Sequence, residues 1–399
     1  MIHPRHLHAS DLQGLARLCV RGVTETTALV ENLHAVISPM PARREADARL
    51  RTRGITGLVY RSIHGVTGLV GGTLDRTLGF AAERVGTREC TAARRRALAV
   101  LNGVLGDQLA ADDNPLAIEM ALLGANSEAR HPASSGERVA IFLHGLCMDE
   151  RCWQPSAASD RASDLPEALA AGGWSVEHVR YNTGRHVHQN GRDFERLLAR
   201  RFEEAEEPPR EIALVGHSMG GLVARSAMHQ ALDHGSAWIE TSSLRLVCIG
   251  TPHHGSPVER AGHGIDRLLG ISRYSAPFAR LGKMRSAGIT DLRHGNVLRA
   301  DAGHEDRFHP VGDSRNPTRV PAQASCFAVA ATLDRDPESA RSRYVGDGWV
   351  PVPSALGRHV DPRLNLPFEP EQTMVVPETG HIELLHHPEV VRAVGRWLG

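Results

Sequence analysis

The five residues Gly216-His217-Ser218-Met219-Gly220 restrict the fold more than any other feature. They lie in "EIALVGHSMGGLVARSAMHQAL", where an apolar, strand-like run passes through a serine flanked by glycines into helix-forming residues. In a strand–turn–helix of this type, the serine occupies a strained turn that lifts its hydroxyl off the sheet edge. The glycines are needed because side chains there would collide with the neighbouring strand and helix. We therefore predict that Ser218 is a nucleophile.

The surrounding chain alternates between strand and helix patterns. Helices are predicted at 161–171, 190–204 and 219–233, and strands at 139–145, 175–182, 211–218, 244–252, 326–332 and 373–377. This order predicts an α/β fold with a mostly parallel sheet and helices on both faces. The stretch at about 256–325 is too long for an ordinary connection, and we interpret it as an inserted cap or lid.

The chain before residue 132 has a different pattern. Residues 10–110 read as three helices, so we predict a helical region at 1–132 followed by an α/β domain at 133–399. The second helix carries interior glycines, each of which costs about 1 kcal/mol relative to alanine. It must therefore be supported either by close packing or by a lipid surface. Its predicted apolar face consists of Ile55, Leu58, Val59, Ile63, Val66, Leu69, Val70 and Leu74.

Composition narrows the classes of partner and cofactor. The 46 basic residues balance the 46 acidic residues, so net charge gives no reason to expect a nucleic-acid partner. We see no signal peptide and no apolar stretch of membrane-spanning length. The sequence therefore predicts a cytoplasmic protein, with peripheral membrane contact through the N-terminal helices left open. The six cysteines form no CxxC pair, so free thiols are expected, and we predict neither a cofactor nor a metal.

A nucleophilic serine needs a histidine base and an acid that orients it, and in this fold class the chain order is serine, acid, histidine. Because the chain has 23 histidines, position must select the base. His381 follows the last predicted strand by a short loop and precedes the final helix, so it should overhang the same sheet edge. The rivals His386 and His387 adjoin Pro388 and suit a helix start better.

The acid is predicted to be Asp347. It lies between two glycines in "GDGWVPVPSALG", on a loop that follows the strand predicted at 326–332. The alternatives Asp334, Asp336 and Asp361 have ordinary explanations as solvated loop residues.

An oxyanion hole needs two backbone N–H donors near the serine. We expect one from Met219, directly after the nucleophile. The other should come from the turn "FLHGLCMD" after the first strand, where Leu146 is the candidate and Cys147 the runner-up. In the same turn, His144 is a candidate substrate contact. The adjacent histidines His253 and His254 of "TPHHGSP" do not easily face one metal ion.

In combination, "FLHGL", "GHSMGGLVAR", "GTPHHGSP", "GDGWVPVPSALG" and "GHIELLHHPEVV" resemble the α/β-hydrolase superfamily. They look most like its lipase and esterase branch, including bacterial triacylglycerol lipases and the GPI-inositol-deacylase-like group. The resemblance covers roughly residues 136–399. It implies Ser218, Asp347 and His381 as the triad, with Leu146 and Met219 as oxyanion donors. It also implies that the loop of His253 and His254 lines the active-site mouth, which makes both residues candidate substrate contacts.

The sequence therefore predicts a serine carboxylic-ester hydrolase, an esterase or lipase, that acts on hydrophobic or lipid-like acyl esters. Two alternatives stay open. One is an acyltransferase on the same scaffold, in which an alcohol accepts the acyl group. The other is a peripheral lipid- or partner-binding protein whose working part is the helical region. Acyl chain length, alcohol preference and oligomeric state are not specified by these motifs.

Overall fold

The computed structural model describes residues 8–37, 43–44, 50–85, 91–124, 137–154, 164–205, 207–240, 243–256, 286–301, 313 and 315–399. Its contacts divide the chain into two compact units. One consists of residues 1–98, 108–117 and 262–285, and the other of 99–107, 118–261 and 286–399. The predicted boundary at 132/133 lies outside the described residues. So does most of the predicted lid, at 257–285, 302–312 and 314.

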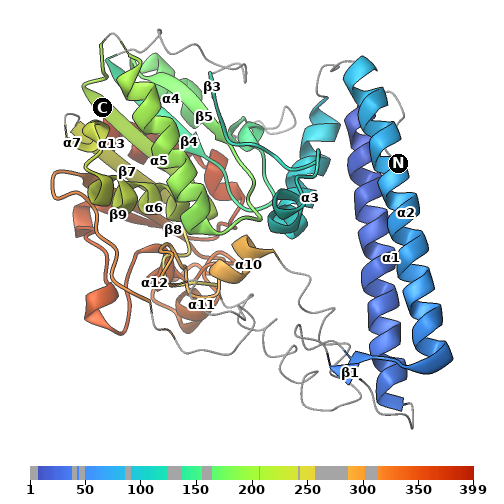
Figure 1. Ribbon diagram of the computed structural model, residues 1–399. Coiled ribbons are helices and arrows are strands. Elements are labelled where there is room, and N and C mark those ends of the chain that lie inside the picture. The colour runs from blue at the N-terminus through green and yellow to red at the C-terminus, as the bar shows by residue number, and fades with distance from the viewer. Residues whose placement is uncertain are drawn as a thin grey trace. The chain divides into compact units, whose positions relative to one another are not determined.

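The first unit is dominated by a long helical hairpin. Figure 1 shows α1 (Ala9–Ile37) and α2 (Gly54–Val85) side by side. The short strands β1 (Arg43–Arg44) and β2 (Leu50–Arg51) pair between them. The next helix, α3 (Ala92–Ala111), is divided between the two units, since its residues 99–107 belong to the second. The N-terminal helical region predicted from the sequence is thus confirmed. No helix among the residues described here combines the length and apolarity needed to cross a bilayer.

The hairpin is held by small residues and by charge. A Cβ at Gly71 would lie 2.9 Å from Val20, so α1 and α2 approach closely there. The Arg17 guanidinium donates to both oxygens of Asp75, through Nη2 at 3.0 Å to Oδ2 and through Nε at 2.5 Å to Oδ1. The predicted apolar face of α2 does not turn toward α1, since Ile55 is 84% exposed and Leu69 73% exposed.

The second unit is built on a seven-stranded sheet with the order β3-β5-β4-β6-β7-β8-β9. All neighbours are parallel except β3 and β5. The strands are β3 (Ala121–Gly124), β4 (Arg138–Leu143), β5 (Ser175–Arg180), β6 (Glu211–His217), β7 (Ser243–Ile249), β8 (Ser325–Ala331) and β9 (Thr373–Val376). The mostly parallel α/β sheet is confirmed, and β3 is a strand that the sequence did not suggest.

Helices cover both faces of this sheet (Figure 1). On one face, α5, α6 and α7 pack against alternate strand residues such as Ile141 and Leu214. On the other, α4 and α13 pack against Phe142 and Val215. The helices are α4 (Leu165–Ala171), α5 (Val187–Glu203), α6 (Met219–His234), α7 (Ala237–Glu240), α10 (Ala287–Asp291), α11 (Ala340–Tyr344), α12 (Val352–Ala355) and α13 (Pro388–Leu398). The two layers bury all but the first residue of the central strands β4 and β6, which explains their continuous apolar runs.

Candidate active site

Ser218 occupies a strained turn between β6 and α6. Its backbone has φ 53° and ψ −123°, a region that non-glycine residues rarely adopt. The Ser218 N–H donates to the Ile249 carbonyl at 2.9 Å, which ties the turn to the carboxyl end of the neighbouring strand β7. This is the strand–turn–helix geometry that the sequence predicts.

The flanking glycines are required by close backbone approaches. A Cβ at Gly216 would lie 2.4 Å from the Gly221 nitrogen, and one at Gly220 would lie 2.3 Å from the Leu143 carbonyl oxygen. Neither distance is compatible with a side chain. The two glycines therefore let α6 start directly against β6 and β4, with Ser218 at the sheet edge.

Asp347 and His381 form a hydrogen-bonded pair. The His381 Nδ1 donates to Asp347 Oδ2 at 2.7 Å. The other carboxylate oxygen accepts the N–H groups of Trp349 at 2.9 Å and Val350 at 2.8 Å. Because both oxygens are engaged and both side chains are buried, the acid and the imidazole hold fixed orientations.

The imidazole of His381 lies beside the turn that carries the serine. Its ring centroid is 4.8 Å from that of His217, the residue directly before Ser218. The His217 Nε2 donates to the His381 carbonyl at 3.1 Å. Burial, followed by the neighbouring His381, holds the pKa of His217 well below its ordinary value, so this ring is neutral. The structure thus gathers Ser218, Asp347 and His381 at one edge of the sheet.

The turn after β4 also lies against the serine. A Cβ at Gly145 would be 3.1 Å from the Ser218 Cβ, and Leu146 follows Gly145 directly. The runner-up donor, Cys147, already gives its N–H to the Thr183 hydroxyl at 3.2 Å. This leaves Leu146 as the better candidate in this turn.

Met219 is the first residue of α6. The first N–H groups of a helix have no partner within it, and they carry the positive end of the helix dipole. The Met219 N–H therefore has the position expected of the second oxyanion donor.

Each of the three alternative acids forms a hydrogen bond or an ion pair within its own loop. Asp334 accepts the Ser339 hydroxyl at 2.8 Å, and Asp361 forms an ion pair with Arg363. Asp336 accepts a backbone N–H two residues further on, at 2.9 Å. These local contacts agree with the interpretation of all three as ordinary loop residues.

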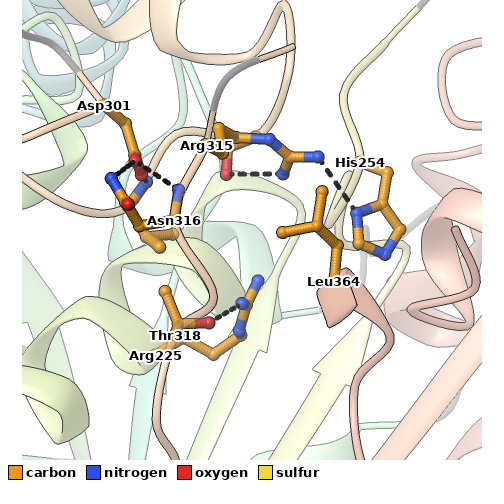
Figure 2. Close-up of a pocket in the computed structure, with 9 residues that line it drawn as sticks. Arg225, His254, Asp301, Arg315, Asn316, Thr318 and Leu364 are labelled. Atoms are coloured by element: carbon orange, nitrogen blue, oxygen red, sulfur yellow. Dashed lines mark hydrogen bonds between the residues drawn. The ribbon is translucent and has the colours of Figure 1, made fainter. Parts of the chain in front are cut away.

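His253 and His254 are buried and held by two arginines. Arg225 donates to the His253 Nδ1 at 3.0 Å, and Arg315 donates to the His254 Nδ1 at 3.2 Å, the second of which Figure 2 shows. Burial and the positive arginines lower the pKa of His254 to about 3 and that of His253 well below its ordinary value. Both rings are therefore neutral acceptors that fix the loop after β7.

His144 is also a buried support. Its ring stacks on Tyr181 with centroids 4.4 Å apart, and the Tyr181 hydroxyl donates to the His144 carbonyl at 2.6 Å. These contacts fix the turn that carries Leu146. Direct substrate contact by His144, His253 or His254 stays a prediction.

Sequence reasoning missed the residues that hold these histidines, chiefly Arg225, Arg315 and Tyr181. Arg225 offered one signal, because it is the only charged residue in the apolar helical run "GGLVARSAMHQAL". A charge in that position calls for a buried polar partner. Arg315 gave no such signal, since it reaches His254 across 61 residues of chain.

Comparisons with known proteins agree with this architecture. Residues 135–319 match the family described as PGAP1-like alpha/beta domain. Esterase PIR7B of Oryza sativa subsp. japonica is 30% identical over 132 residues, which are 32% of this chain and 46% of that protein. The chain thus matches less than half the length of this curated relative.

The solved structures that resemble this chain share little sequence with it. Lipase BlEst2 of Bacillus licheniformis in its mature form is 17% identical, with 70% of this chain and 98% of that chain covered and a TM-score of 0.42. Est1E of Butyrivibrio proteoclasticus is 12% identical, with 70% and 91% covered and a TM-score of 0.32. The sheet order, the family match over residues 135–319 and the similarity to an esterase support the resemblance to the lipase and esterase branch of the α/β-hydrolase superfamily.

Proposed function

We propose that the protein is a serine carboxylic-ester hydrolase that acts on hydrophobic acyl esters, with Ser218 as its nucleophile. The observation that carries this proposal is the Asp347–His381 pair, whose imidazole lies beside the strained turn of Ser218. A serine, a histidine and a buried acid at one sheet edge supply what acyl transfer requires.

Each proposed role follows from an atom's position. Because the His381 Nδ1–H is held by Asp347, its Nε2 is free to take the Ser218 proton as the Oγ attacks the ester carbonyl carbon. The amides of Leu146 and Met219 stabilise the oxyanion, and one such donor contributes on the order of 10²–10³ in turnover. His381 then returns the proton to the leaving alcohol. Water, activated in the same way, cleaves the acyl-enzyme.

The preference for hydrophobic esters rests on the helical hairpin. Along α2, the side chains of Ile55, Val66 and Leu69 are 84%, 61% and 73% exposed. An apolar stripe of this length is typical of surfaces that contact lipid or a partner. We propose that it brings the protein to a membrane or emulsion surface. Arg61 and Arg76 are among its few cations, so the attraction to anionic lipid should be modest.

The test is covalent labelling combined with a substrate series. A fluorophosphonate probe should label the wild-type protein and not Ser218→Ala, which should also lose p-nitrophenyl ester turnover by several orders of magnitude. Ser226→Ala is the matched control, because this serine lies in α6, the helix that follows Ser218, and its hydroxyl donates to the Val297 carbonyl at 2.6 Å. Persistent labelling of Ser218→Ala would refute the assignment. Rates across short to long acyl chains then define the substrate class.

A further inference from the structure

A second group of chemically active side chains lies apart from the proposed triad. His186, His188 and Asp291 each offer one ligand atom, and these atoms all lie within 4.8 Å of one another. His186 is the N-cap residue of α5, His188 lies in the first turn of that helix, and Asp291 ends α10. All three belong to the α/β unit.

The carboxylate of Asp291 is buried and already oriented. Its side chain is 3% exposed, and the His186 Nδ1 lies 3.1 Å from Oδ2 and 3.2 Å from Oδ1. The backbone N–H of Val187 donates to Oδ2 at 2.8 Å. Ligating carboxylates in metal sites are typically fixed by such additional hydrogen bonds.

The spacing suits a small tetrahedral ion. Two ligand atoms that are each about 2.0–2.1 Å from a zinc ion at the tetrahedral angle lie about 3.3 Å apart. The His186–Asp291 separation of 3.1 Å is close to this value. The His188 ring, whose centroid is 5.1 Å from that of His186, has to turn inward to complete the set. The His188 side chain is only half-buried.

We propose that His186, His188 and Asp291 form a binding site for a divalent transition-metal ion, with Zn²⁺ the best match. Two imidazoles and one carboxylate suit zinc, whereas calcium and magnesium require oxygen ligands. The metal takes the place of the His186 Nδ1 proton, which moves to Nε2 of the same ring or to solvent. The fourth position is left to water.

Charge and topology set the strength and the effect of binding. The single negative charge of Asp291 favours binding of the cation. The positive charges of Arg192 and Arg299, which lower the pKa of His188, oppose it. The ion would join the start of α5 to α10, whose ligands are 105 residues apart in the chain. Because binding to the folded state stabilises it by mass action, zinc should raise the unfolding temperature.

The experiment is calorimetric titration of untagged, chelator-treated full-length protein with Zn²⁺, followed by thermal unfolding with and without the ion. The wild type should bind one equivalent at this site and gain in Tm. His188→Gln should weaken binding by more than the roughly 10- to 100-fold typical of outer-shell changes, and should lose the gain in Tm. Asp291→Asn should do the same and provides an independent second variant.

His229→Gln is the matched control. His229 lies 3.5 Å from Asp233 in an i,i+4 pair that is not part of a three-ligand cluster within the described ranges. Its loss should leave the titration unchanged. The proposal would be overturned if the wild type and His188→Gln bound zinc equally well. It would also be overturned if zinc did not change the Tm of the wild type. Ester turnover does not enter this test, so the result is independent of the hydrolase assignment.

Discussion

His381 and Asp347 are joined twice, once through side chains and once through the backbone. The Nδ1 donates to Oδ2 at 2.7 Å, and the His381 N–H donates to the Asp347 carbonyl at 3.1 Å. The second bond fixes the two loops relative to each other, independently of the side chains. A change in the carboxylate should therefore alter the state of the imidazole without releasing the loop that carries it.

This leads to a prediction about the acid. Asp347→Asn should reduce ester turnover on the order of 10⁴-fold, because an amide does not hold the histidine in the required tautomer. Asp361→Asn is the control, since that carboxylate pairs with Arg363 on its own loop. Steady-state rates on a short p-nitrophenyl ester decide the matter. If Asp361→Asn lost most of its ester turnover and Asp347→Asn lost little, Asp361 would be the triad acid instead.

The glycine before the serine gives a second prediction. Gly216→Ala places a Cβ 2.4 Å from backbone, so the start of α6 must shift. We expect a loss of about 1–3 kcal/mol in the free energy of unfolding and a steep loss of turnover. Gly65→Ala is the control, because nothing lies within 4 Å of its Cβ position inside α2. It should stabilise by about 0.4–1 kcal/mol. Urea unfolding followed by circular dichroism measures both changes.

The buried guanidinium of Arg225 gives a third prediction. It is 4% exposed and donates to His253 and Thr318, both of them uncharged acceptors. Arg225→Lys should therefore destabilise the fold more than Arg225→Met, because lysine keeps the buried charge but loses the forked donor geometry. We expect the lysine variant to lose about 1–3 kcal/mol relative to the wild type. A methionine variant with the lower unfolding midpoint would contradict this reasoning.

The sequence predicted the central strands well, for a physical reason. Strands buried on both faces appear as continuous apolar runs, and all six predicted strands are found in the sheet. The edge strand β3, "ALLG", was missed because four apolar residues cannot be assigned to strand or helix by periodicity. Its pairing with β5 depends on tertiary contacts that no local pattern encodes.

The candidate site was predictable to the extent that it depends on topology. Residues that follow parallel strands meet at one edge, which is why Ser218, Asp347 and His381 could be named from their positions after strands. The supports of the site were not predictable. Arg315 and His254 approach each other only through the folded loops, and the cluster of His186, His188 and Asp291 depends on a contact across 105 residues.

A fourth prediction concerns pH. Burial lowers the pKa of His178 to about 4 and that of His254 to about 3, from an ordinary value of 6.5. Between these values and 6.5 the unfolded chain binds more protons than the folded one, so stability increases with pH and is lost as pH falls. Urea midpoints should therefore decline as pH decreases from about 6.5 toward about 4.

The variant His178→Phe isolates one of these contributions. His178 faces Phe142 with ring centroids 5.4 Å apart, so an aromatic replacement keeps the contact. The slope of stability against pH should become shallower in this variant. An unchanged slope in His178→Phe would contradict the assigned cause.

The last prediction separates the helical hairpin from the chemistry. Deletion of residues 1–132 removes β3 and residues 99–107 of α3, which belong to the α/β unit and include the Asp107 carboxylate that accepts the Ala287 N–H at 3.1 Å. That truncation should lose stability and solubility first.

Deletion of 1–90 keeps α3 and β3 and removes only α1, α2 and the segments around them, so the sheet and the proposed triad should persist. We expect the shorter deletion to hydrolyse a short soluble ester at a rate close to that of the full chain. It should lose activity on a long-chain emulsion and flotation with liposomes, because the exposed apolar stripe of α2 is gone. Unchanged flotation would place lipid contact elsewhere, and loss of short-ester turnover in a well-folded deletion would mean that the hairpin helps to build the site.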